Sequence, residues 1–77
     1  MKAFWSLWDV ETGNSLGTYD TEDDALAVVR ALLVANGDGY AEALDLGRRS
    51  TRGEWEAVAG GSRLAELARA GSANRSA

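Results

Sequence analysis

The segment at residues 2–10, KAFWSLWDV, is apolar in both of its alternating sets of residues. Successive side chains of an extended strand point to opposite faces of a sheet, so this strand has no polar face to turn toward water. One set consists of Ala3, Trp5 and Leu7, and the other consists of Phe4, Trp8 and Val10. The pattern predicts a central strand whose two faces are both covered, either by the protein itself or by a partner.

The small size of the chain makes it hard to cover both faces internally. Its 77 residues include neither cysteine nor histidine. A domain of this size buries little surface, and it commonly depends on a disulfide, a metal or association with another chain. Disulfides are excluded by the composition, and the usual zinc and copper ligands are absent. We therefore expect no metal and no cofactor, and association is the remaining source of stability.

The first half of the chain predicts a hairpin followed by a helix. The sequence ETGNS is typical of a hairpin turn, and residues 16–19 return as the second strand. Thr21 predicts the N-cap of a helix that begins at about Glu22, because its hydroxyl can accept from a free amide of the first turn. Apolar residues then recur at helical spacing up to the stop signal at Gly37.

The second half predicts the same order of elements. Residues 40–46 and 55–59 alternate and predict a second hairpin, and residues 62–70 predict a helix capped by Ser62. The expected fold is α+β, a two-layer ββαββα arrangement of four mainly antiparallel strands with the helices on one face. Residues 1–70 form the single domain, and residues 71–77 are expected to be a disordered tail. An internal duplication stays open, beside the simpler explanation that two hairpin–helix units share one pattern.

Charge is distributed unevenly along the chain. Residues 1–47 carry two basic residues and nine carboxylates, whereas residues 48–77 carry six arginines and three glutamates, and the formal net charge is −4. An acidic majority opposes general binding to nucleic acid, which depends on the neutralisation of phosphates. The sequence has no run of about eighteen apolar residues and no signal-peptide pattern. We therefore expect a cytoplasmic protein that does not bind membranes.

The sequence carries no catalytic motif. With neither histidine nor cysteine, and with Lys2 as the single lysine, acid–base or nucleophilic chemistry would have to rely on carboxylates. The densest acidic group, residues 20–24, has the spacing of the start of a calcium loop, but Ala25 stands where that loop needs glycine. Capping of the helix explains the same carboxylates. We expect a protein that is not an enzyme.

Three arginines, Arg48, Arg49 and Arg52, form a candidate basic loop in the second hairpin, within the sequence GRRSTRG. They could bind phosphate, contact an acidic surface or present Ser50 or Thr51 to a kinase. A hairpin tip exposed to water explains them without any ligand. We do not expect nucleic acid as a partner.

The predicted central strand also predicts an interaction surface. Trp5 and Trp8 are three positions apart and point to opposite faces unless a bulge intervenes. Because both helices are expected on one face, at least one indole lies on the other. Such an indole is typical of a dimer interface or a partner groove, and the alternative is a second layer made by the C-terminal helix. The candidate interface residues are Phe4, Trp5, Leu7, Trp8 and Val34.

The segment WDVETGNSLGTYDTEDDALAVVRALL resembles the hairpin and helix of small bacterial proteins that are mostly uncharacterised. Its helix entry Asp23-Asp24-Ala25-Leu26 is similar to that of HicB-like antitoxins, in which it also follows a strand of the sheet. The GC strand signature of those antitoxins is absent. The resemblance implies a sheet that binds a partner.

These observations lead to one expected function and one competing interpretation. We expect a noncatalytic protein–protein interaction module, with a homodimer as its simplest form and another protein as the alternative partner. The competing interpretation is a small nucleic-acid-binding or antitoxin-like regulatory protein, which the acidic first half opposes.

Overall fold

Seven elements make up the part of the chain that the structure describes. The computed structural model covers the backbone of residues 2–76 and the side chains of residues 2–70. In chain order, the elements are β1 (Phe4–Asp9), β2 (Asn14–Tyr19), α1 (Glu22–Asn36), the short helix η1 (Asp38–Ala43), β3 (Leu44–Arg49), β4 (Trp55–Gly60) and α2 (Gly61–Ser76). The predicted order of strands and helices is confirmed, with η1 as an additional element.

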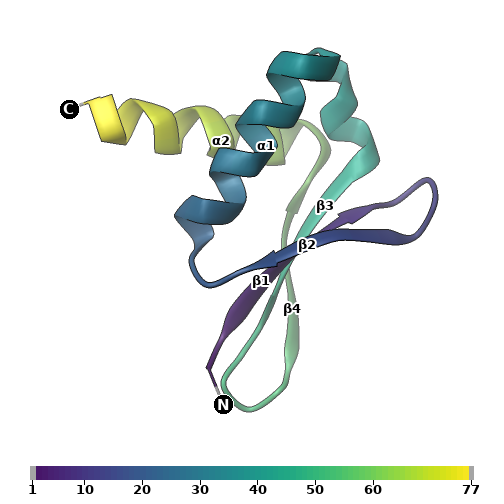
Figure 1. Cartoon of the computed structure of the whole chain (residues 1–77), viewed down its shortest axis with the longest axis vertical. Helices are drawn as coiled ribbons and strands as arrows, with labels where there is room; N and C mark the ends of the chain where they lie inside the picture. Colours follow the sequence, from purple (N-terminus) through teal and green to yellow (C-terminus); the bar gives the residue numbers. More distant parts are fainter. Residues whose placement is uncertain (1, 77) are drawn as a thin grey trace.

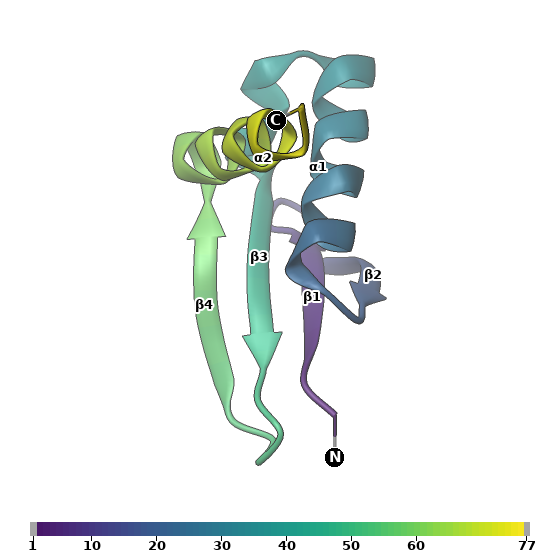
Figure 2. The same cartoon turned by 90° about the vertical axis from the view of Figure 1, so that its left-hand side faces the viewer.

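The four strands form one antiparallel sheet in the order β2-β1-β3-β4. β1 is therefore a central strand, as its apolar pattern predicts, with β2 on one side and β3 on the other. Figures 1 and 2 show α1 and α2 packed toward one end of β3 and β4. The β3–β4 turn and the start of β1 project beyond the helices at the other end. The predicted α+β architecture is confirmed.

A small apolar core fills the space between the sheet and the helices. Leu7 of β1 lies opposite Leu46 of β3, and both side chains are fully buried. Val29 of α1 and Leu64 of α2 belong to the same cluster and are also fully buried. Each such side chain contributes roughly 1.5–3 kcal/mol when it leaves water. The core that holds the helices in place therefore lies on one face of the sheet.

Both ends of α1 are fixed by the residues that the sequence indicates. The Thr21 hydroxyl accepts a hydrogen bond of 3.1 Å from the Asp24 backbone N–H. Gly37 has a φ of 91°, and its N–H donates to the Leu33 carbonyl at 2.7 Å. A positive φ favours glycine, because glycine has no Cβ to clash with the backbone. The predicted start and end of this helix are confirmed.

The strand predicted at residues 40–46 is wrong in its first half. The strand begins only at Leu44, and the residues before it form η1. Alternating small apolar residues in a short segment do not distinguish a strand from a short helix. In η1, both Ala41 and Ala43 are buried, and the Tyr40 N–H donates to the Gly37 carbonyl at 3.1 Å. The turn at the end of α1 therefore continues directly into η1.

The second helix starts earlier than the sequence suggests. α2 begins at Gly61, so Ser62 lies within its first turn and is not the residue that precedes it. Leu64 and Ala68 are fully buried, as the helical spacing predicts. The domain limit at residue 70 and the disordered tail at residues 71–77 stay predictions, because the side chains of residues 71–76 and the whole of residue 77 lie outside the described part.

Substitution of the N-cap should destabilise the domain measurably. Thr21→Ala removes the hydroxyl that pairs with the Asp24 N–H, and we expect it to lower the free energy of unfolding by about 1 kcal/mol. Urea unfolding followed by circular dichroism measures the change. Thr51→Ala is the control, since Thr51 is exposed in the β3–β4 turn. Equal urea midpoints for the two variants would contradict a capping role for Thr21.

Candidate interaction surface

The face of the sheet opposite the helices carries three rows of paired residues from β1, β3 and β4. Residues that lie directly opposite each other in antiparallel strands project from the same face. We call this surface the open face, and its rows are Phe4–Arg49–Trp55, Ser6–Gly47–Ala57 and Trp8–Asp45–Gly60. The two outer rows contain aromatic and charged side chains, and the middle row contains small residues.

Aromatic rings dominate the outer rows of the open face. The ring centroids of Phe4 and Trp55 are 6.4 Å apart, and the ring planes are inclined by 50°. Trp55 is 47% exposed, whereas Phe4 and Trp8 are half-buried. A Cβ placed on Gly47 would lie 3.4 Å from Cζ2 of Trp55, so the indole lies directly over this glycine. A side chain that extends beyond Cβ at position 47 would therefore meet the Trp55 ring.

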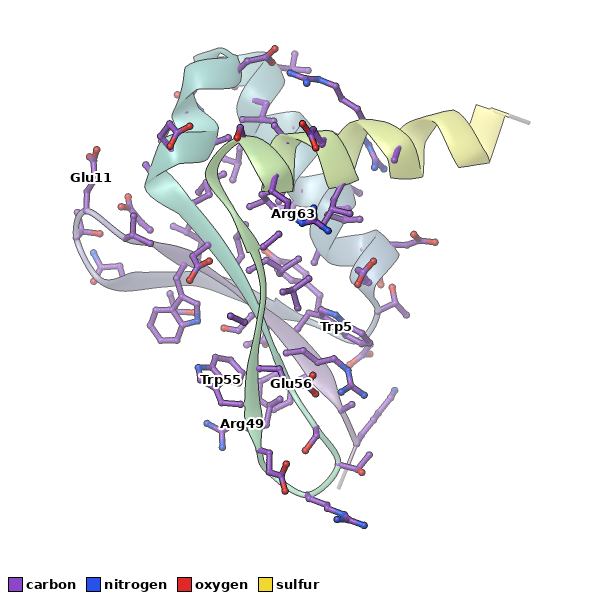
Figure 3. All side chains as sticks on the ribbon, turned by 180° about the vertical axis from the view of Figure 1, so that it is seen from behind. Trp5, Glu11, Arg49, Trp55, Glu56 and Arg63 are labelled. Carbon is purple, nitrogen blue, oxygen red and sulfur yellow. The ribbon has the colours of Figure 1, made fainter. Side chains whose placement is uncertain are left out.

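Arg49 lies over the exposed indole on the same face. Its guanidinium carbon is 5.0 Å from the centroid of the Trp55 ring, within the range of a cation–π interaction. Its Nη1 donates a hydrogen bond of 2.8 Å to the Gly53 carbonyl. Figure 3 shows Arg49 and Trp55 together on one side of the β3–β4 hairpin. Both contacts hold the guanidinium near the surface of the open face.

A second arginine–tryptophan pair lies on the helix side of the sheet. The guanidinium carbon of Arg48 is 5.4 Å from the centroid of the Trp5 ring. Its Nη1 also donates to Oε1 of Glu56 at 2.9 Å, so this arginine has both a ring and a carboxylate as neighbours. Figure 3 shows Trp5 and Glu56 on the side of the hairpin opposite Trp55. The two pairs are thus separated by the thickness of the sheet.

The structure brings together only part of the predicted interface. Phe4 and Trp8 share the open face, as the strand parity indicates. Leu7 is fully buried under the helices, and the partly buried Trp5 packs against that core on the helix side of the sheet. Val34 is 88% exposed, but it lies on α1 and not on the sheet. Leu7, Trp5 and Val34 therefore do not belong to the open face.

The three predicted loop arginines do not form one cluster. β3 extends through Arg49, so Arg48 and Arg49 are strand residues whose side chains point to opposite faces. Arg52 is exposed in the turn that follows. The Arg48 side chain is already paired with Glu56. The three guanidinium groups therefore do not lie on one face of the hairpin, and phosphate binding by them stays an untested alternative.

Sequence reasoning missed Trp55 and Asp45 as members of the surface. The alternation in EWEAVA does separate Trp55 and Ala57 from their neighbours. The sequence does not show which of the two sets faces the helices, because this depends on the register between β3 and β4. In the structure, Gly47 pairs with Ala57 and Arg49 pairs with Trp55, and this register places Trp55 and Ala57 on the face opposite the helices. One clue was available in the sequence. A glycine, Gly47, lies two residues before Arg49, the partner of Trp55, and leaves space for a large ring.

A pocket of about 330 Å³ lies between the helices, away from the open face. It is lined by Arg30, Leu33, Val34, Asp38, Ala68 and Arg69. Nη1 of Arg30 donates to the Ala68 carbonyl at 2.9 Å, and Nη2 of Arg69 pairs with Oδ2 of Asp38 at 2.6 Å. Both guanidinium groups of the pocket thus have partners within the protein, and these contacts join α1, η1 and α2.

The described residues contain no group of three or more acidic side chains placed to hold a metal ion. None of the helices in the described part of the chain is long and apolar enough to span a bilayer. No family model, curated protein or solved structure matches the chain. The geometry of the open face therefore carries the functional argument.

A larger residue at position 47 should displace the exposed indole. Gly47→Val places methyl groups where the Trp55 ring lies, so we expect the indole to move and the Phe4–Trp55 contact to open. The Trp55 indole N–H resonance in a nitrogen–proton correlation spectrum measures the displacement. Gly39→Val is the control, since a Cβ at Gly39 meets no atom within 4 Å. An unchanged Trp55 resonance in Gly47→Val would contradict the described packing.

Proposed function

We propose that the chain is a noncatalytic protein interaction module that self-associates through the open face. One observation carries this proposal: the exposed Trp55, its neighbour Phe4 and, in the other outer row, Trp8 lie on a sheet face that no element in residues 2–76 covers. Contiguous exposed apolar side chains with charged neighbours mark interaction surfaces, and tryptophan is enriched among the residues that dominate binding energy. We place this module in the cytoplasm, as the sequence analysis expects.

The size of the open face supports a weak dimer. The side of the sheet that carries the open face, counted over all four strands of six residues at about 3.3 Å per residue and about 4.8 Å between strands, is roughly 400 Å² when β2 is included. Projecting side chains make the accessible surface larger than this flat area, so two stacked copies would bury roughly 1,000 Å² in total. This is slightly below the ~1,200 Å² of standard specific interfaces. We therefore propose a dissociation constant in the micromolar range.

The distribution of acidic side chains supports a noncatalytic role. The chain has no histidine or cysteine, so a catalytic base would have to be a carboxylate. On the open face the available carboxylate is Asp45, and its row holds Trp8 and Gly60 and no nucleophilic side chain. This arrangement fits contact with a partner better than proton transfer or nucleophilic attack.

Removal of one ring should dissociate the dimer. Trp55→Ser on the edge strand β4 removes the most exposed aromatic side chain of the open face while the helix-side core is unchanged. Burial of this ring contributes roughly 2 kcal/mol in each copy, so we expect the dissociation constant to rise by roughly a thousandfold. Sedimentation equilibrium measures the constant, and circular dichroism verifies the fold. Trp8→Ser should act in the same direction.

Val34→Ser is the matched control for this experiment. It removes an apolar side chain that is 88% exposed, but on α1. We expect this variant to dimerise like the wild type. A wild-type chain that stays monomeric at several hundred micromolar would refute self-association, and a monomeric Val34→Ser beside a dimeric Trp55→Ser would move the interface to the helices.

Nucleic acid should not bind to the arginines of the second hairpin. Arg48 is paired with Glu56 and points away from Arg49, which opposes joint contact of the three guanidinium groups with one phosphate backbone. We expect no measurable binding to short RNA or DNA at physiological salt in fluorescence anisotropy. Binding that weakens steeply with salt and disappears on replacement of Arg48, Arg49 and Arg52 by alanine would favour the nucleic-acid interpretation instead.

A further inference from the structure

The open face carries two charged side chains without an oppositely charged partner. Neither Arg49 nor Asp45 forms an ion pair within residues 2–70. Asp45 is half-buried, and its carboxylate accepts no hydrogen bond from the described side chains or backbone. A carboxylate without a partner in its own chain is available to a cation of a second copy. The face thus has one free cation and one free anion among its described residues.

Arg48 shows which contact Arg49 lacks. On the helix side, Arg48 has the Trp5 ring and the Glu56 carboxylate as neighbours. On the open face, Arg49 has the Trp55 ring and a backbone carbonyl, but it forms no ion pair within the described residues. A guanidinium has five N–H donors, so Arg49 retains donors for a carboxylate. No carboxylate of residues 2–70 pairs with it, so these donors are available to a carboxylate of a second copy.

The two charges lie on the same lateral side of β3. The Arg49 guanidinium lies over Trp55, at one end of β4. The Asp45 carboxylate lies over Gly60, at the other end of β4, since a Cβ on Gly60 would be 2.8 Å from Oδ1. Four residues separate the two along β3, which corresponds to about 13 Å. The cation and the anion are therefore displaced from each other along the strands and not across them.

We infer that a second copy of the chain stacks on the open face with its strands reversed, so that Arg49 of each copy pairs with Asp45 of the other. This inference rests on the proposed function and specifies its geometry. The twofold axis runs across the strands at the level of Gly47 and exchanges the two outer rows. β4 then faces β4 of the partner, and Phe4 faces Trp8. Because the Trp55 indole lies over Gly47, the two Trp55 rings then face each other near the axis, between the small residues of the two middle rows.

The other aligned arrangement brings like charges together. Stacked sheets pack with their strands nearly aligned or nearly perpendicular. A twofold axis along the strands keeps each row at its own level. If this axis runs over β3, Arg49 of one copy faces Arg49 of the other and Asp45 faces Asp45; if it runs between β1 and β3, the like charges lie in the same row about one strand spacing apart. Like charges in contact oppose association and select against this orientation. Self-complementary charge therefore favours the reversed stack, which forms two ion pairs per dimer.

Charge reversal tests how the two copies are oriented, separately from the question whether the open face forms the interface. Arg49→Glu alone and Asp45→Arg alone each place like charges opposite each other, and we expect each to raise the dissociation constant by about tenfold or more. A mixture of the two single variants should form a heterodimer of about wild-type affinity, because both ion pairs are then restored. The double variant Arg49→Glu/Asp45→Arg should also regain the homodimer. Sedimentation equilibrium measures all four states.

Arg52→Glu and Glu11→Arg are the matched controls. They make the same changes of charge at exposed residues in the β3–β4 and β1–β2 turns, outside the three rows, and we expect them to leave dimerisation unchanged. Figure 3 shows Glu11 in the β1–β2 turn, away from the pair formed by Arg49 and Trp55.

Failure of the orientation and failure of the proposed function give different results. The reversed stack is wrong if the single charge variants have the dissociation constant of the wild type. It is also wrong if the mixture of the two variants dimerises no more tightly than each variant alone. Dissociation by Trp55→Ser would then keep the open face as the interface, whereas a dimeric Trp55→Ser would refute both. If Asp45→Arg does not fold, the smaller changes Arg49→Gln and Asp45→Asn decide, because each must weaken the dimer if the ion pairs form.

Discussion

The contact between Leu7 and Leu46 on the two central strands determines the rest of the architecture. Both side chains are fully buried beneath α1 and α2. Because the side chains of a strand alternate, this contact places Trp5 on the helix side and sends Phe4 and Trp8 to the opposite face. A shift of one residue would bury the larger rings under helices whose inner surface consists of leucine, valine and alanine. The same contact that forms the core therefore also creates the open face.

The sequence predicts those features that depend on local chemistry and fails where long-range register decides. The N-cap at Thr21, the stop at Gly37 and the central position of β1 follow from residue type and alternation, and the structure confirms them. The opposed directions of Arg48 and Arg49 depend on how far β3 extends, and the cross-strand partner Glu56 is eight residues away. The place of Trp55 depends on the pairing of β3 with β4. Neither can be deduced from spacing alone.

The aromatic side chains form a partial layer of their own on the open face. Ser6 in the middle row is 2% exposed although no helix lies over it, and Trp55 lies over the neighbouring Gly47. Trp55 is held by this glycine, by the Phe4 ring and by the Arg49 guanidinium. A ring fixed in this way loses little conformational freedom on contact with a partner, which lowers the entropic cost of association. In the proposed dimer, the Trp55 side of the open face is thus already ordered before a partner binds.

The edges of the sheet are poorly suited to pairing, which supports the proposed association through the open face over pairing between strands. Both edge strands contain a bulge: Leu16 in β2 and Val58 in β4 are skipped in the registers with β1 and β3. A bulge twists the strand and interrupts the row of backbone groups that a further strand would need. In β4, the exposed Glu56 adds a charge next to this irregularity. Growth of the sheet by a strand from a second copy is therefore disfavoured at both edges, whereas the open face offers apolar rings, a small central row and unpaired opposite charges.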